Sequence, residues 1–219
     1  MLDAIPIKCV LLGESAVGKS SLINRFIHGT FKQEFLPTIA GCYSSKEVFY
    51  EKEKMKLRYE IWDTAGQEKY RSINKIFYQD AIITILVYDI TRKDSFEAIK
   101  DYWYSEIREN APKEAIVVIV GNKSDLYEHE EVNDDEVKEY CKSINALHKQ
   151  TSAQTGEGIQ DLFDTIGSKI LTPENIEAFN KMKEENNLNR LKNDKINIRA
   201  FSNTSENENV SNKKKNKCC

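Results

Sequence analysis

As far as residue 171, the hydrophobic pattern of the chain alternates between two kinds of segment. Short runs of β-branched and aliphatic residues, typical of buried parallel strands, fall at residues 7–12, 82–88 and 116–120. Longer segments with apolar residues three and four positions apart predict helices at 19–28, about 91–109, 133–146 and 159–170. Thr91 is expected to cap the second helix, and Asn133 or Asp134 to open the third.

Two further segments predict an antiparallel hairpin. Residues 48–50 and 57–62 are apolar, and they flank the charged stretch EKEKMK, which suits a polar turn. Strands that alternate with helices favour an α/β fold, in which right-handed helical crossovers join parallel strands. The pattern therefore predicts a mostly parallel sheet with one antiparallel edge hairpin and with helices on both faces.

The composition of the chain changes after Leu171. Residues 172–219 contain 12 asparagines, ten basic and seven acidic residues, so the tail carries a charge of +3 and the preceding body −6. Thr172 and Pro173 suit the first turn of a helix. Beyond about Asp194, too few apolar residues remain to offset the entropy lost on ordering. We therefore expect a globular domain at 1–171 and a variable tail at 172–219, helical at first and then disordered.

Overall composition narrows the possible classes of protein. The chain has 219 residues, 40% of them hydrophobic, which is enough to build the core of one domain. A net charge of −3 gives no reason to expect nucleic acid as a partner. The apolar runs are too short to span a bilayer, the N-terminus does not resemble a signal peptide, and five cysteines do not form a disulfide framework.

The stretch GESAVGKS at residues 13–20 is the first sign of chemistry. It matches the phosphate-binding loop pattern, and it follows a predicted strand and precedes a predicted helix. Its glycines allow the backbone to direct several N–H groups at phosphate oxygens, and the helix N-terminus favours negative charge. Lys19 supplies a mobile cation for the outer phosphates, and Ser20 offers a hydroxyl oxygen to Mg²⁺. This loop alone does not separate an ATPase, a kinase and a GTPase.

Two later motifs make that choice. Asp63 ends a predicted strand, where its carboxylate can hold Mg²⁺; after it, Gly66 permits close approach to a terminal phosphate and Gln67 can orient an attacking water. The stretch NKSD at 122–125 follows another strand. Asp125 can accept two N–H bonds from guanine, which adenine cannot offer, so this motif favours guanine nucleotides.

The motifs GESAVGKS, IWDTAGQEKY, LVYDIT, GNKSDL and TSAQTG stand in this order, together with Thr38 after Pro37. In this combination, the chain resembles the Rab family of Ras-like small GTPases over about residues 5–171 and in its C-terminal Cys-Cys. The Ser15-Ala16 pair is most similar to the early-endosomal branch. The resemblance implies a P-loop NTPase fold with a six-stranded sheet, binding of GTP or GDP with Mg²⁺, and slow hydrolysis of GTP.

The resemblance also implies roles for individual residues. Gln67 and Lys19 would be catalytic, and Ser20, Thr38 and Asp63 would hold the metal. The nucleotide would be contacted by Ser15, Ala16, Val17, Gly18, Lys19, Ser20, Ser21, Phe31, Thr38, Gly66, Asn122, Lys123, Asp125, Ser152, Ala153 and Gln154. Within this set, a backbone N–H of Ser152-Ala153 would meet guanine O6. Gln154 stands where the family often has Lys.

The same resemblance implies protein partners. A guanine-exchange factor, a GTPase-activating protein, a GDP-dissociation inhibitor or escort protein, and effectors are expected to act on a monomer. Tyr43, Trp62 and Phe77 would form the aromatic triad that effectors contact, although simple core packing explains Tyr43 equally well. The first switch reads Thr38-Ile39-Ala40-Gly41-Cys42-Tyr43, with a glycine lost at one position and gained at the next, so unusual effectors are expected.

The chain ends in lysines at 213–215 and 217, followed by Cys218-Cys219. In Rab-like proteins this ending implies geranylgeranylation of both thiols, and two lipid chains anchor a protein where one does not. The lysines add attraction to anionic lipid. We therefore expect the chain at the cytoplasmic face of intracellular membranes, with endosomes favoured and with a cytosolic pool. An unmodified basic tail is the alternative.

Two classes of function remain open from the sequence. The first is a hydrolysing switch that cycles between membrane and cytosol, and the second is a non-cycling, nucleotide-bound scaffold. Intact Gln67, Thr38 and Asp63 favour the first class. A phosphate kinase is a distant third possibility, disfavoured by residues 122–125 and by the lipid-acceptor ending.

Overall fold

The computed structural model describes residues 4–31, 38, 41–64, 76–177 and 181. Internal contacts divide the chain into Met1–Thr172 and Pro173–Cys219. The strands of the first unit are β1 (Ile5–Leu12), β2 (Cys42–Tyr50), β3 (Met55–Asp63), β4 (Ile83–Asp89), β5 (Ile116–Asn122) and β6 (Leu147–Thr151). Its α-helices are α1 (Lys19–His28), α3 (Lys93–Ala98), α4 (Tyr104–Asn110), α5 (Asp134–Ser143) and α6 (Ile159–Ile170). A π-helical stretch, Ile99–Trp103, joins α3 to α4, and a short 3-10 helix covers Ser124–His129.

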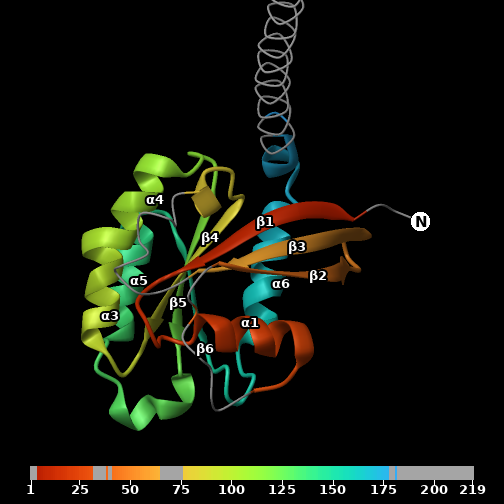
Figure 1. The fold of residues 1–219 in the computed structure, drawn as a ribbon. Coiled ribbons are helices and arrows are strands. Elements are labelled where there is room, and N and C mark those ends of the chain that lie inside the picture. The colour runs from red at the N-terminus through yellow and green to blue at the C-terminus, as the bar shows by residue number, and fades with distance from the viewer. Residues whose placement is uncertain (1–3, 32–37, 39–40, 65–75, 178–180, 182–219) are drawn as a thin grey trace, which may run out of the picture. The chain divides into compact units, whose positions relative to one another are not determined.

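The six strands form one sheet in the order β2-β3-β1-β4-β5-β6. β2 pairs with β3 in the antiparallel sense, and all other neighbours are parallel. Helices cover both faces of the sheet, with α1 and α6 on one side and α3, α4 and α5 on the other (Figure 1). The predicted α/β, P-loop NTPase fold with one antiparallel edge hairpin is confirmed.

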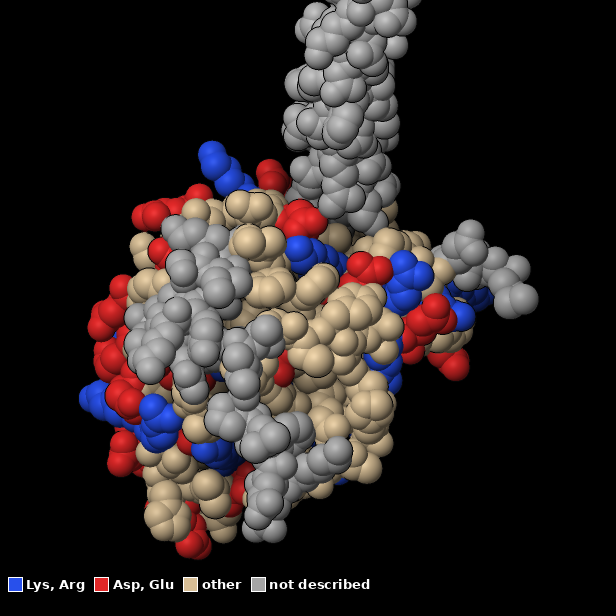
Figure 2. Space-filling model, viewed as in Figure 1, with Lys and Arg blue, Asp and Glu red and all other residues tan. Residues whose placement is uncertain are grey.

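The sheet has a hydrophobic core on each of its two faces. On one face, Phe26 of α1 and Phe163 of α6 stack against each other, and both meet Tyr59 of β3 edge-on. On the other face, Val10, Leu86 and Ile119 of three neighbouring strands pack with a cluster from the helices α3 to α5. Residues of one strand that differ by one position point to opposite faces, so near-continuous apolar strands supply both layers. Figure 2 shows acidic side chains gathered on the α3 and α4 side of the molecule, in keeping with the negative charge of this unit.

Two details differ from the sequence predictions, and a third element was expected from the resemblance alone. Thr91 does not cap α3, because Asp89 at the end of β4 accepts its hydroxyl at 2.8 Å and its N–H at 2.9 Å; Arg92 holds the N-cap position instead. Helix α5 is capped by Asn133 as predicted, but it ends at Ser143, since Asn145 is left-handed with a φ of 55°. Strand β6 was expected only from the family sheet, because its polar sequence LHKQT does not read as a strand.

Candidate functional site

The carboxyl ends of five neighbouring strands bring the predicted motifs together at one edge of the sheet. Leu11 of β1 lies opposite Asp63 of β3, whereas Asn122 of β5 lies between Asp89 of β4 and Thr151 of β6. Parallel α/β sheets bind ligands at this edge, because strand ends and helix N-termini converge there.

The loop at residues 13–18 joins β1 to α1 in a backbone conformation that requires glycine at two positions. Gly13 and Gly18 have φ values of 139° and 94°, in the region that side chains disfavour. A Cβ at Gly13 would lie 2.2 Å from the carbonyl oxygen of Val87, and one at Gly18 would lie 2.3 Å from Nδ2 of Asn122. The loop therefore runs tightly between its neighbours into the N-terminus of α1, which suits the binding of an anion.

Lys19, the first residue of α1, folds its ammonium back over this loop. Nζ donates to the carbonyl oxygens of Gly13 and Glu14, at 2.9 Å each, and the residue is only 6% exposed. Burial lowers the pKa of Lys19 to about 8, although Asp63 and Glu14 partly oppose the shift. A cation with so little hydration favours an anionic partner.

Oxygen atoms from three separate segments meet beside Lys19. The hydroxyl of Ser20 donates to Oδ2 of Asp63 and lies 3.1 Å from Oγ1 of Thr38. The other carboxylate oxygen, Oδ1 of Asp63, is buried and lacks a hydrogen-bond partner among the described residues. Burial raises the pKa of Asp63, against the opposing effects of Ser20 and Lys19. Because an unpaired buried carboxylate oxygen is costly and a hard cation prefers oxygen ligands, this cluster fits Mg²⁺.

Asn122 links the phosphate loop to the loop after β6. It is 1% exposed, and its Nδ2 donates to the carbonyl of Val17 at 2.9 Å. Its Oδ1 accepts the hydroxyl of Thr151 at 3.3 Å and the N–H of Ala153 at 3.2 Å. The side chain of Asn122 therefore holds β5, the phosphate loop and the loop after β6 in a fixed arrangement.

The rest of the NKSD motif is held from both sides. Lys123 has a φ of 67°, and its ammonium pairs with Oδ2 of Asp89 at 2.5 Å. The hydroxyl of Ser152 donates to Oδ1 of Asp125 at 2.5 Å, which brings the two predicted guanine-binding segments into contact.

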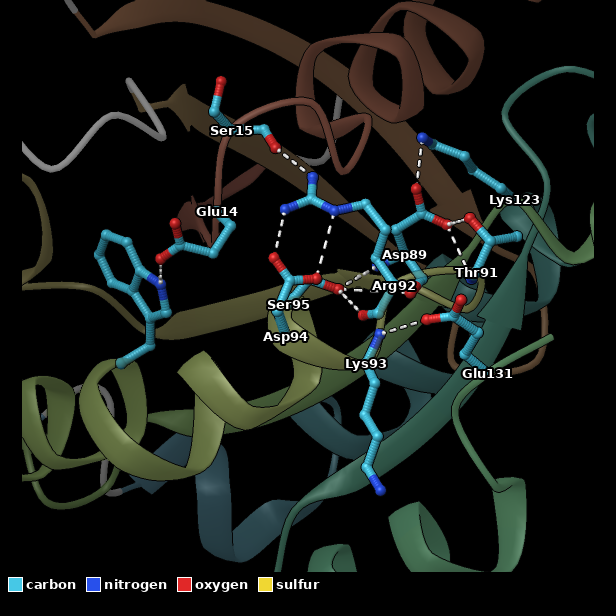
Figure 3. A network of polar contacts seen from close by, with 11 residues as sticks. Glu14, Ser15, Asp89, Thr91, Arg92, Lys93, Asp94, Ser95, Lys123 and Glu131 are labelled. Carbon is cyan, nitrogen blue, oxygen red and sulfur yellow. Dashed lines mark hydrogen bonds and ion pairs between the residues drawn. The ribbon is translucent and has the colours of Figure 1, made fainter. Parts of the chain in front are cut away.

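Figure 3 shows a polar network at the corner between β4 and α3. Arg92 donates to the carbonyl of Ser15 in the phosphate loop at 3.0 Å, and it also pairs with Asp94 at 2.8 Å. At the same corner, Asp89 binds Thr91 through one carboxylate oxygen and Lys123 through the other. The corner therefore contacts both the phosphate loop and the NKSD motif.

The rings of the predicted aromatic triad form one continuous cluster, with Tyr43 edge-on to Trp62 and Phe77 tilted against it. The ring of Trp62 lies 5.3 Å from the rings of Tyr43 and Phe77, measured between centroids. Tyr43 is 50% exposed, so it is not a simple core residue. A Cβ at Gly41 would lie 2.5 Å from Phe77, so the unusual glycine of the first switch gives this ring its place.

Among the remaining predicted site residues, Phe31 is described and is 36% exposed. Gly66, Gln67, Cys218 and Cys219 lie outside the described residues. Sequence reasoning missed Arg25, Asp89 and Arg92. Asp89 could have been identified, because it is an acidic residue at the end of an apolar strand. The two arginines could not, because they contact the carbonyls of residues far away in the sequence.

Comparisons with known proteins agree with this geometry. The model of the Ras family matches residues 8–172. The chain is 39% identical over 164 residues to the Ras-related protein Rab-22A of Homo sapiens, covering 75% of this chain and 83% of the relative. The chain belongs to the Rab family of Ras-like small GTPases.

Other Rab relatives give the same result. The Ras-related protein RabJ of Dictyostelium discoideum is 36% identical over 183 residues, which is 84% of this chain and 70% of that protein. Rab-31 of Rattus norvegicus is 40% identical over 170 residues, 78% of this chain and 86% of the relative. The Rab-family resemblance and the predicted GTPase activity are thereby confirmed. Within the described residues of this Rab-family GTPase, no helix has the length and apolarity needed to cross a membrane.

Proposed function

We propose that this GTPase binds GTP or GDP with Mg²⁺ at the carboxyl edge of its sheet and acts as a membrane-anchored switch in vesicle trafficking. The observation that carries the proposal is Oδ1 of Asp63, which is buried and has no hydrogen-bond partner in the described part of the chain, beside the partly dehydrated ammonium of Lys19. One group calls for a cation and the other for an anion, and a magnesium-bound polyphosphate supplies both.

In this proposal, Lys19 binds the outer phosphate oxygens once it leaves the carbonyls of Gly13 and Glu14. Ser20, Thr38 and Asp63 hold Mg²⁺, which when bound would neutralise charge on the phosphate oxygens. The N–H groups of residues 15–21 surround the phosphates. No arginine stands in the loop GESAVGKS, so intrinsic hydrolysis is slow, and a GTPase-activating protein raises it by orders of magnitude.

Guanine selectivity rests on the NKSD motif. Asp125 accepts the N1 and N2 hydrogens of the base, and the hydroxyl of Ser152 fixes the carboxylate. Lys123 lies along the base with its aliphatic stem, held by Asp89, and Phe31 packs across it. A site with a carboxylate in this place rejects adenine, because adenine leaves that carboxylate unpaired.

The switch follows from contacts that need the third phosphate. Gln67 orients the attacking water, and Thr38 and Gly66 bind the γ-phosphate, so hydrolysis releases both segments. Effectors then distinguish the two states at the aromatic cluster of Tyr43, Trp62 and Phe77. An exchange factor and an escort or GDP-dissociation inhibitor complete the cycle.

Membrane attachment is proposed to occur through lipid on Cys218 and Cys219, with the chain at the cytoplasmic face of endosomal membranes and a cytosolic pool. Mass spectrometry of the protein from its native cell is expected to show two added prenyl groups on the C-terminal peptide. Free thiols at both cysteines would count against anchoring while leaving nucleotide binding intact.

The nucleotide proposal is tested by uptake of labelled GDP and ADP in the presence of Mg²⁺. We expect GDP to bind far more tightly than ADP. Asp125→Asn is expected to lose guanine and gain xanthine nucleotides, since an amide can donate to the xanthine O2 and accept from its N1–H. The exposed Asp94→Asn serves as control and should keep the preference for GDP. Equal binding of GDP and ADP by the unaltered chain would overturn the proposal.

A further inference from the structure

The helical segment that follows β4 contains one π-helical turn. α3 and α4 are parts of one continuous helical run, and Ile99–Trp103 between them is wound as a π-helix. A π turn takes in one residue more than an α-helical turn, so it changes the direction in which the residues at its end point. Single π turns within α-helices are rare and are often found at functional sites. The residue at the end of this one is Trp103.

Trp103 is a core residue whose polar tip reaches the phosphate loop. The residue is 1% exposed, and its ring packs in the core with Phe96 and Ile107. Its indole Nε1 donates to Oε1 of Glu14 at 3.1 Å, between residues 89 positions apart in the chain. A buried indole N–H usually has a hydrogen-bond partner, and here that partner belongs to the loop GESAVGKS. The π turn therefore joins the helix to the phosphate loop.

A second bond connects the same helical run to the next residue of the loop. Arg92, which directly precedes α3, donates to the carbonyl oxygen of Ser15 at 3.0 Å. The consecutive residues Glu14 and Ser15 are thus both bonded to this run, the first through its side chain and the second through its backbone (Figure 3). The loop is attached to the helix at two points.

Glu14 introduces an electrostatic problem into a loop that suits an anion. Its carbonyl oxygen accepts from Nζ of Lys19 at 2.9 Å, and the charge of its carboxylate opposes the burial that lowers the pKa of Lys19. A carboxylate that turned towards this ammonium would compete with phosphate oxygens for it, and it would repel them as well. Figure 3 shows the carboxylate of Glu14 turned instead towards the indole.

We propose that Trp103, presented by the π turn, is a positioning residue for the outer phosphates of the nucleotide. Its N–H holds the carboxylate of Glu14 beside the helix, which leaves the ammonium of Lys19 to the phosphates. The inference rests on the proposed binding of GTP and GDP. Loss of the indole N–H is expected to weaken GTP more than GDP, because GTP places an additional negative charge near Lys19 and Glu14.

The test measures the ratio of two affinities in Trp103→Phe, which lacks the N–H and keeps an aromatic ring in the core. GDP and a non-hydrolysable GTP analogue each compete against a fluorescent GDP in the presence of Mg²⁺. The affinity for the GTP analogue relative to GDP is expected to fall by about threefold, since one added charge interacts only modestly across a partly solvated site. Replacement of Trp103 by benzothienylalanine, which has sulfur in place of the N–H and the same fused-ring shape, should give the same fall without a change in packing.

The Glu14→Gln background separates positioning from structural support. The amide has no charge to direct at Lys19 or at the phosphates, so Trp103→Phe should leave the affinity ratio unchanged in this background. A defect in the core would instead act equally with Glu14 and with Gln at this position. Tyr104→Phe serves as control, because its ring packs against Tyr140 in the same helical region, and it should not change the ratio.

Two results would overturn the inference. One is an affinity ratio that neither replacement of Trp103 lowers, and the other is a ratio that Trp103→Phe lowers by the same factor in the Glu14→Gln background. Failure of the unaltered protein to prefer GDP over ADP would instead overturn the proposed function, so the two failures are distinguishable.

Discussion

Replacement of Asp89 by Asn probes the corner that holds Lys123. Asp89 is 1% exposed, and one of its oxygens accepts the N–H and hydroxyl of Thr91 while the other pairs with the ammonium of Lys123. The amide oxygen of Asn can still accept from Thr91. Its NH₂ group, however, would face the ammonium, so one donor would meet another.

The size of the effect follows from the burial of the two partners. Loss of one member of a fully buried ion pair costs about 3–5 kcal/mol. The side chain of Lys123 is 34% exposed, so its ammonium can turn towards water and recover part of that loss. We therefore expect Asp89→Asn to lower the free energy of unfolding by about 2–3 kcal/mol. Release of GDP should also become faster, because the stem of Lys123 is no longer fixed beside the base.

Urea unfolding with GDP and Mg²⁺ held at one saturating concentration measures the first effect, and a fluorescent GDP measures the second. The Kd of each protein for GDP is measured with the same fluorescent nucleotide, and the part of the stability change that comes from weaker binding, RT times the logarithm of the ratio of the two Kd values, is subtracted. The matched control is Asp94→Asn at the same corner, where a carboxylate that is 69% exposed pairs with Arg92. That exposed pair should contribute less than about 1 kcal/mol. If both variants lower the free energy of unfolding by the same amount, the reasoning that burial makes the Asp89–Lys123 ion pair the stronger one is wrong.

Three other outcomes are expected. Gly167→Ala would place a Cβ 2.0 Å from the ring of Tyr50, so it should lower the free energy of unfolding by about 1–3 kcal/mol in thermal denaturation. The exposed Ser168→Ala on the same helix should not lower it, and equal effects of the two substitutions would contradict the steric argument. Burial raises the pKa of Tyr50 from 10.0 to about 12, so the folded state retains this proton and stability should fall as pH rises from about 10 towards 12; Tyr50→Phe should flatten that fall in urea titrations, and an unchanged slope would argue against it. Gln67→Leu should trap the GTP-bound form and Ser20→Asn should favour GDP; an unchanged single-turnover hydrolysis rate in Gln67→Leu would refute the role of that side chain.

Much of the fold and site was readable from local pattern. Apolar strands, helical spacing and the charged turn between residues 48–50 and 57–62 predicted the α/β class and the edge hairpin, which the strand pairing confirms. The motif order predicted the family, which the comparisons confirm. Predictions failed where one residue depends on a neighbour in space. Thr91 has the right type for a cap, yet Asp89 takes its hydroxyl, and the polar edge strand β6 becomes a strand only by pairing with β5.

The sequence by itself determined which chemistry this chain carries, because glycines, a lysine, carboxylates and an amide that follow strands in this order are typical of a site for phosphate, Mg²⁺ and guanine. Only the tertiary structure decided how those groups are held. The bond from Ser20 to Asp63, the ion pair of Asp89 with Lys123 and the bond from Arg25 to the Ala153 carbonyl join segments far apart along the chain. Such contacts depend on strand register and helix placement, and a linear pattern does not encode a direction in space.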